Sequence, residues 1–373
     1  MKDLKICREE IDAIDRQLIA LFEKRMDVVK DVIKYKVAHD MEIFQPEREK
    51  KVLEKNLTRL ENKELSVYAQ CFIQDLLSVS KDYQSDLLPL QFQEEYKTSF
   101  KENAVVGYQG VAGAFSQAAV TRFFGEGTNN IGYPEFEDVY KALEDGNIDY
   151  GVLPIENSLT GSINDNYDLI RKYGFHIVGE VSVPVSQCLM ALPGVSLKDI
   201  TQAYSHPQGL AQSSDFFNEH RYIEPMPYKD TAMAAKYVHE RQEKNKAAVA
   251  SPLAAQLYGL EIIQSNIQND KSNMTRFMVI SKEFICPEDS NKMSIIFTLN
   301  HEVGTLYNML QIIRQCQINL VRIESRPMKK ENWQYYFYID FEGNIRDEKM
   351  KKAIEKMKTN CNTLRVLGNY CKK

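Results

Sequence analysis

The stretch N-D-K-S-N-M-T-R-F, residues 269–277, lies between two apolar runs at 260–267 and 277–280. The runs have the character of short strands, so the polar stretch is predicted to be a loop at their ends, where a rigid scaffold presents reactive side chains. Arg276 can hold a planar carboxylate with two hydrogen bonds, and the Thr275 hydroxyl can donate a proton. These groups suit a small, acidic, hydroxylated substrate; a simple turn is the alternative.

Length, charge and cysteine usage restrict the class of protein. The 373 residues suffice for two or three domains, and a net charge of −5 argues against nucleic-acid binding, which needs a basic surface. The seven cysteines include no C-x-x-C pair and are odd in number, so they indicate neither a zinc site nor a disulfide framework. The sequence shows no apolar signal core and no run near the ~20 residues that span a membrane. We therefore expect a cytoplasmic protein without a metal, a membrane or a nucleic-acid partner.

The first segment, residues 1–90, is predicted to be all helical. Apolar residues recur at helical spacing through about 35 residues, and no glycine or proline interrupts them before Pro46. Such a helix would be about 50 Å long, more than the diameter of a small domain. We therefore expect it to pack against a second copy in an intertwined dimer. Further helices are predicted to start near Pro46 and to cover residues 64–83.

Polar residues on these helices share faces. Arg25 and Lys36 lie about three turns apart on nearly one face, and Ser80 and Gln84 lie one turn apart. Arg8 points about 100° away from Arg25, which places it to serve a site on a neighbouring copy. The alternative reading is a solvated, charged helix face.

This set resembles the all-helical chorismate mutases over the whole segment. The matching residues are Arg8, Ile11, Ile14, Asp15, Arg25, Lys36, Pro46, Glu47, Arg48, Glu49, Ser80 and Gln84. The resemblance implies that Glu49 and Ser80 position the ring hydroxyl and a carboxylate of chorismate. Gln45 stands where some members have an aspartate that touches this hydroxyl.

The same resemblance implies how the charges of the substrate are held. Arg25, Arg48 and Arg8 of a second copy would hold the two carboxylates of chorismate. Lys36 and Gln84 would donate to the ether oxygen, which gains negative charge as its bond breaks in a single pericyclic step. The reaction needs no cofactor.

The middle segment, residues 103–282, changes pattern. Strand-like runs alternate with helical patterns and cover residues 104–108, 150–155, 176–185, 203–205, 247–250 and 260–267. This alternation predicts an α/β architecture with largely parallel sheets. The glycine-rich turn at 107–113 has neither the full G-x-G-x-x-G spacing nor the lysine of a P-loop, so a nucleotide is not expected.

Three polar loops stand out in this segment: P-I-E-N-S-L-T-G at 154–161, S-H-P-Q at 205–208 and N-M-T-R-F at 273–277. The first two are predicted to precede helices, whose free N–H groups can bind a carboxylate; helix capping is the alternative. Together with a G-x-x-G-x-F-S turn at 110–116 and D-T-A at 230–232, they occur in the order found in prephenate dehydratases, which the segment resembles throughout.

That resemblance implies two lobes around a cleft, like a type II solute-binding protein. Thr275 would be the general acid that protonates the ring hydroxyl of prephenate while the ring carboxylate departs as carbon dioxide. Asn157, Ser158 and Gln212 would orient carboxylate and hydroxyl, with Phe277 against the ring. Aromatisation drives the loss, so no cofactor is implied.

Two residues of the motifs have more than one reading. Arg276 is grouped with the substrate-binding residues, and bracing of its own loop is the alternative. His206 has the residue type of a base, but its S-H-P-Q setting favours a structural role.

The last segment, residues 291–373, is predicted to be α+β. Strands at 293–299, 318–325, 333–341 and 363–367 and helices at 304–316 and 347–358 give the ferredoxin-like order βαββαβ. Residues 304–306 (G-T-L) and 324–327 (E-S-R-P) resemble the phenylalanine-binding motifs of ACT domains.

The resemblance implies that phenylalanine binds between two such domains from different subunits and lowers dehydratase activity. The residues that carry it are Gly304, Leu306, Glu324, Ser325 and Arg326. Thr305 replaces the usual alanine and Val303 a common proline, changes that are expected to weaken binding. An oligomerisation domain without a ligand is the alternative.

The three resemblances imply a bifunctional enzyme that converts chorismate to prephenate and then to phenylpyruvate, as a homodimer or homotetramer. A transcriptional regulator is the second hypothesis, but the acidic balance and the lack of a basic helix-turn-helix disfavour it. A solute-binding protein is the third, and the missing signal sequence disfavours it.

Overall fold

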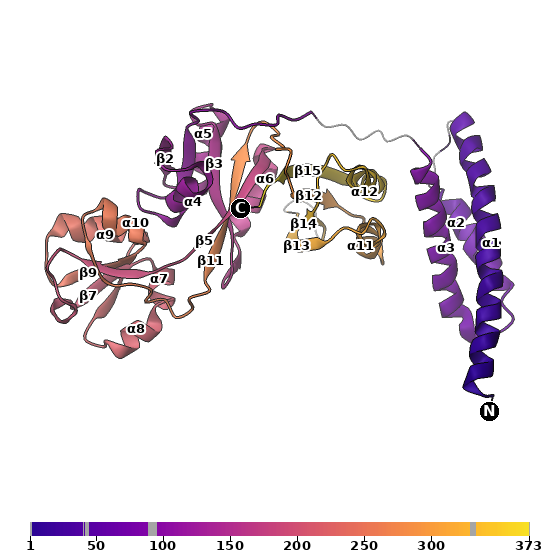
Figure 1. Ribbon diagram of the computed structural model, residues 1–373, viewed down its shortest axis with the longest axis horizontal. Helices are drawn as coiled ribbons and strands as arrows, with labels where there is room; N and C mark the ends of the chain where they lie inside the picture. The colour runs from indigo at the N-terminus through magenta and orange to yellow at the C-terminus, as the bar shows by residue number, and fades with distance from the viewer. Residues whose placement is uncertain (1, 40, 42–44, 89–94, 329–332, 373) are drawn as a thin grey trace. The chain divides into compact units, whose positions relative to one another are not determined.

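The computed structural model describes residues 2–39, 41, 45–88, 95–328 and 333–372. The chain divides into two compact units, one of Met1–Gln93 with Lys351–Asn360 and one of Glu94–Met350 with Cys361–Lys373 (Figure 1). Residues 89–102 are polar with mixed charge and are predicted from the sequence to be a linker; residues 89–94 lie outside the described residues. No helix in the described ranges is both long and apolar enough to cross a membrane.

The first unit contains α1 (Leu4–Ala38), α2 (Pro46–Thr58), the short helix η1 (Lys63–Leu65) and α3 (Ser66–Asp86). The predicted helix of about 35 residues is confirmed, because α1 has 35, and Asp3 caps its N-terminus by accepting from the Lys5 N–H at 2.7 Å. Its buried residues all lie in its C-terminal half, from Met26 to Lys36. The large apolar residues of its N-terminal half are exposed, Leu18 by 46% and Ile14 by 56%.

A sheet in the order β2-β1-β3-β11-β5, with β4 added beside β3, forms the first lobe of the second unit. Its strands are β1 (Val106–Gln109), β2 (Asn130–Tyr133), β3 (Tyr150–Asn157), β4 (Gly161–Ser162), β5 (His176–Pro184) and β11 (Met274–Ser281). The helices of this lobe are α4 (Phe115–Phe124), α5 (Phe136–Glu144) and α6 (Asn164–Tyr173). β1 is parallel to β2 and β3, whereas β11 runs antiparallel to β3 and β5.

The second lobe is built on a sheet in the order β10-β6-β9-β7-β8. Its elements are β6 (Cys188–Ala191), η2 (Leu197–Asp199), β7 (Gln202–Ser205), α7 (Pro207–Ala211), α8 (Ser214–Glu219), β8 (Glu224–Pro227), α9 (Thr231–Arg241), β9 (Lys246–Ala250), α10 (Pro252–Leu257) and β10 (Glu261–Gln264). The chain enters this lobe after β5 and returns through β11, so two segments join the lobes (Figure 1). The predicted two-lobed α/β fold is confirmed. The prediction of largely parallel sheets is wrong, because β11 in the first sheet and β6 in the second run antiparallel to their neighbours.

One local prediction in this segment is wrong. Residues 274–277 are the first part of β11 and not a loop, because Thr275 pairs with Asn157 of β3 and with Val183 of β5. Successive side chains of a strand point to opposite faces of the sheet. Thr275 and its neighbour Arg276 therefore point in opposite directions.

The third sheet, in the order β13-β14-β12-β15, is antiparallel throughout. Its elements are β12 (Lys292–Thr298), α11 (Thr305–Gln315), β13 (Leu320–Pro327), β14 (Tyr335–Glu342), α12 (Glu348–Thr359) and β15 (Thr363–Tyr370), which confirms the ferredoxin-like order. One face of this sheet shares a core with the first lobe, where Ile296 and Tyr338 join Tyr167 and Ile170 of α6. The Tyr338 hydroxyl donates to the Tyr167 carbonyl at 2.9 Å.

Candidate active sites

A cleft of about 620 Å³ lies between the two lobes of the second unit. The first lobe contributes Asn157, Thr275 and Phe277 to its lining, and the second contributes Gln187 and Gln212. Most of the lining is uncharged, so the cleft presents hydrogen-bonding groups and an aromatic ring more than charge. Its size is within the range of ordinary small-molecule sites.

Thr275 is held by a neighbouring amide. The Asn157 Nδ2 donates to the Thr275 Oγ1 at 3.0 Å and to the Asn273 Oδ1 at 2.7 Å, while its Oδ1 accepts from the N–H groups of Leu159 and Thr160, both at 3.1 Å. These contacts fix which end of the amide faces Thr275. The Thr275 oxygen accepts from Asn157, which leaves its O–H free to donate to a molecule in the cleft.

The other residues predicted for this site divide into two groups. Gln212 and Phe277 line the cleft. Ser158 lies outside the lining: its hydroxyl accepts from the Met274 N–H at 3.0 Å and holds the start of β11. The His206 Nδ1 accepts from the Gln208 N–H at 3.2 Å at the start of α7, an arrangement that fits the structural role favoured above.

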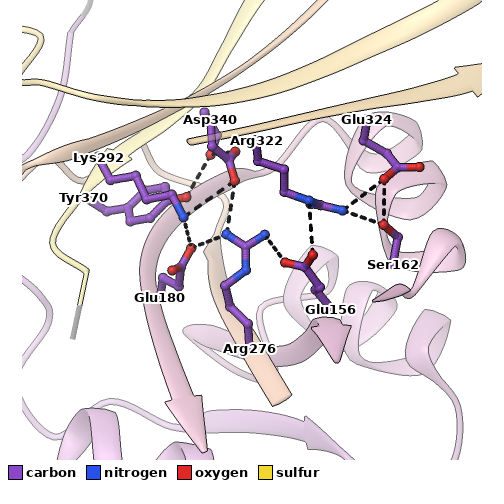
Figure 2. Close-up of polar contacts among 10 residues, drawn as sticks. Glu156, Ser162, Glu180, Arg276, Lys292, Arg322, Glu324, Asp340 and Tyr370 are labelled. Carbon is purple, nitrogen blue, oxygen red and sulfur yellow. Dashed lines mark hydrogen bonds and ion pairs between the residues drawn. The ribbon is translucent and has the colours of Figure 1, made fainter. Parts of the chain in front are cut away.

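Arg276 faces away from the cleft, into a group of buried charges named the ion network here: Glu156, Glu180, Arg276, Lys292, Arg322 and Asp340 (Figure 2). Its Nη1 donates to the Glu180 Oε2 at 2.9 Å and to the Asp340 Oδ2 at 3.1 Å, and its Nη2 lies 2.8 Å from the Glu156 Oε2. Arg276 is absent from the cleft lining. The geometry therefore favours bracing, the alternative reading, over its grouping with the substrate-binding residues.

The pKa values of the ion network follow from burial and pairing. Burial alone lowers the pKa of Arg276, but the carboxylates of Glu180 and Asp340 raise it above its ordinary value. Burial alone raises the pKa of the Asp340 carboxyl, but Lys292 and Arg276 lower it. Arg276 is therefore a cation and Asp340 a carboxylate at neutral pH.

Five residues predicted for the first unit lie in two contacting groups, Arg25 with Ser80 and Gln84, and Lys36 with Glu49. The five are named the helical polar cluster here. The Arg25 Nη1 donates to the Ser80 Oγ, and the Gln84 Nε2 donates to the Ser80 carbonyl at 3.1 Å. The Gln84 Oε1 is buried without a hydrogen-bond partner in the part of the chain described. Burial lowers the pKa of Lys36, and nearby Glu49 partly opposes this.

Two arginines predicted for the same site do not join this cluster. Arg8 and Arg48 are exposed, the first near the start of α1 and the second at the start of α2 beside Glu49. Arg8 lies on the half of α1 that buries no residue within the chain.

The residues predicted for the effector lie in two places. Gly304 is the N-cap of α11 with φ of +87°, a conformation that favours glycine, and Leu306 follows in the first turn. Ser325 is exposed on β13. Glu324 and Arg326 face the first lobe, where the Glu324 Oε2 accepts from the Ser162 Oγ at 2.6 Å and the Arg326 Nη2 donates to the Asp168 Oδ2 at 3.2 Å.

Comparison with known proteins identifies the family. The model of the chorismate mutase type II family matches residues 7–85, and that of the prephenate dehydratase family matches residues 106–284. The bifunctional chorismate mutase/prephenate dehydratase of Aquifex aeolicus is 34% identical over 374 residues, which cover 100% of this chain and 99% of that protein. The chain belongs to this bifunctional family. The enzyme rearranges chorismate to prephenate, then dehydrates and decarboxylates prephenate to phenylpyruvate.

Two solved structures resemble the enzyme over 72% of its chain. A prephenate dehydratase from Arthrobacter aurescens in complex with L-Phe is 28% identical, with a TM-score of 0.66 and 89% of that chain covered. A protein described as the quorum-quenching acylase GqqA is 30% identical, with a TM-score of 0.67 and 98% of that chain covered. One fold thus carries different chemistries, and the residues of the cleft must decide which substrate is used.

Proposed function

We propose that Thr275 is the general acid of the dehydratase reaction and that the cleft between the lobes is its site. The observation that carries this proposal is the hydrogen bond from the Asn157 amide to the Thr275 oxygen. The Thr275 proton passes to the ring hydroxyl of prephenate as its C–O bond breaks, while the electron pair of the C–carboxylate bond enters the ring. Water and carbon dioxide leave, and the ring becomes aromatic.

The other cleft residues have supporting roles in this proposal. Asn157 holds the Thr275 side chain, Gln212 hydrogen-bonds the substrate, and Phe277 packs against its ring. Ser158 and Arg276 act from outside the cleft by holding β11 in place. This division follows the contacts described above.

Thr275→Val tests the proposal, because valine keeps the shape of threonine and removes the proton donor. Dehydratase turnover should fall by about 10² or more, in the range of a positioned acid, and Thr275→Ser should restore part of it. Mutase turnover of the same protein is the internal control. Unchanged dehydratase turnover in Thr275→Val would remove Thr275 from the mechanism.

The mutase site is proposed to be the helical polar cluster, completed by a second copy. Arg25 and Arg48 with Arg8 of the second copy hold the two carboxylates of chorismate. Lys36 and Gln84 stabilise the charge that develops on the ether oxygen. The Gln84 Oε1, which is buried without a hydrogen-bond partner among the described residues, supports a site that is incomplete within one chain.

The remaining site residues and the assembly belong to the same proposal. Glu49 and Ser80 position the ring hydroxyl and a carboxylate. The enzyme is a cytoplasmic homodimer or homotetramer, with the mutase in residues 1–90, the dehydratase in 103–282 and a regulatory domain in 291–373.

Phenylalanine is proposed to bind the last domain and to lower dehydratase activity. Gly304 opens an eleven-residue helix, where the free N–H groups attract a carboxylate, and the Arthrobacter aurescens relative was solved with L-Phe. Ser162 connects Glu324 to the strand pair that carries Asn157, so a shift of β13 reaches the cleft. Calorimetry of the full chain should detect phenylalanine binding, and a flat titration at millimolar phenylalanine would contradict the proposal.

A further inference from the structure

The residues predicted from the sequence supply no cation in the cleft to bind a carboxylate of prephenate. Prephenate carries two carboxylates, one on the ring and one on the pyruvyl side chain. Arg276 was the cation expected to hold one of them, but its guanidinium is occupied by Glu156, Glu180 and Asp340 on the other face of β11. Another group in the cleft must therefore bind a carboxylate of prephenate.

Most ionisable residues of the cleft lining are already engaged. The Asp230 Oδ1 accepts from the Ala232 N–H at 2.8 Å and caps α9, and Glu135 caps α5 together with Asp138. The His206 Nδ1 accepts from the backbone at the start of α7. These groups serve the helices around the cleft and are poor partners for a bound carboxylate.

Lys229 is the single lysine or arginine among the described residues of the lining. It is exposed and makes no ion pair or side-chain hydrogen bond in the described chain. Its backbone is fixed on both sides, because the Tyr228 N–H donates to the Ser205 carbonyl at 2.7 Å and Asp230 caps α9. An exposed cationic side chain therefore extends from a loop that is held on both sides.

The position of Lys229 adds to this argument. The loop lies between β8 and α9 on the second lobe, whereas Thr275 belongs to β11 of the first. A ligand between the lobes can meet the acid from one side and the cation from the other.

We propose that the Lys229 ammonium binds the carboxylate of prephenate that remains in the product, the one on the pyruvyl side chain. A cation paired with the departing ring carboxylate would stabilise the substrate more than the transition state and slow the loss of carbon dioxide. A cation on the retained carboxylate binds both states equally and fixes the ring hydroxyl near Thr275. This proposal rests on the assignment of the cleft as the dehydratase site.

Lys229→Met tests the proposal, because it removes the charge and keeps most of the apolar stem. The KM for prephenate should rise about 10- to 100-fold, the effect of one charge-assisted hydrogen bond, with kcat within about threefold. Lys229→Arg should restore most of the KM. Lys236→Met is the matched control, since Lys236 is exposed on α9 and its ion pair with Glu240 is 3.8 Å long.

Phenylpyruvate distinguishes the two carboxylates, because it retains the pyruvyl carboxylate and lacks the ring carboxylate. Its inhibition constant against prephenate should rise in Lys229→Met by about the same factor as the KM. A raised KM with an unchanged inhibition constant would assign Lys229 to the departing carboxylate and overturn the proposal.

The results of Lys229→Met and Thr275→Val together distinguish a wrong role for Lys229 from a wrong assignment of the cleft. An unchanged KM in Lys229→Met, with Thr275→Val inactive, would refute the role of Lys229 and leave the cleft assignment intact. Full activity in Thr275→Val would remove the assignment on which both depend. Mutase turnover reports only on the first unit, so a thermal melt of each full-chain variant checks that the second unit is folded.

Discussion

The two candidate sites of this chain differ in the number of cationic residues assigned to bind a dianionic substrate. The mutase set contains four cations, Arg8, Arg25, Lys36 and Arg48, whereas the described lining of the dehydratase cleft contains one, Lys229. Both carboxylates of chorismate survive the rearrangement, so both can be held by charge. One carboxylate of prephenate departs as carbon dioxide, and tight binding of that carboxylate would stabilise the substrate and slow the reaction. In the proposed assignments, the site whose substrate keeps both carboxylates has more cations than the site whose substrate loses one.

The sites also differ in what a single chain supplies. The cleft is enclosed by two lobes of one chain, and the Asn157–Thr275 hydrogen bond is formed within it. Arg25 and Lys36 of the helical polar cluster lie on the C-terminal half of α1, and Arg8 lies on the exposed N-terminal half. The comparison predicts that assembly matters more to the mutase than to the dehydratase.

The largest expected effect comes from Lys36→Ala. It removes the cation assigned to the ether oxygen, so mutase kcat should fall about 10²- to 10³-fold, as for other lost transition-state donors. Dehydratase turnover, measured with added prephenate, should stay unchanged. Near-native mutase turnover would show that the helical polar cluster is not the site.

A smaller effect is expected from Leu18→Glu, which places a charge on the exposed apolar side of α1. The variant should weaken association of the chains, and mutase turnover should fall about tenfold at low protein concentration, where Arg8 of the second copy is lost. Sedimentation and a dilution series of both activities check this, with the neighbouring Gln17→Glu as the control. Equal loss of both activities on dilution would remove the distinction between the sites.

Much of the fold was predictable because its signals are local. The 35 residues of α1 follow from an uninterrupted helical period, and the order of the third sheet follows from the alternation of strands and helices. Thr275, Asn157 and Gln212 were found because the sequence resembles a family with these motifs. Local patterns and motifs therefore sufficed for the elements and for part of the cleft.

The direction of Arg276 was missed, although the signal was present. A strand that starts at Met274 puts Thr275 and Phe277 on one face and Arg276 on the other, but the polar stretch was read as a loop. Lys229 was missed for another reason. Lys229 lines the cleft because β8 and α9 place its loop opposite the first lobe. This placement depends on the tertiary fold, so no local sequence pattern could predict it.

The ion network has a consequence for how the enzyme can change. Arg276 and Glu180 come from the dehydratase segment, while Lys292 and Asp340 come from the last one, and all four are largely removed from water. Loss of one member leaves another charged without its partner in a poorly solvated place, which is costly. Substitutions at these positions are therefore expected to be tolerated in pairs. A last domain transplanted from another protein would have to bring a matching carboxylate and ammonium with it.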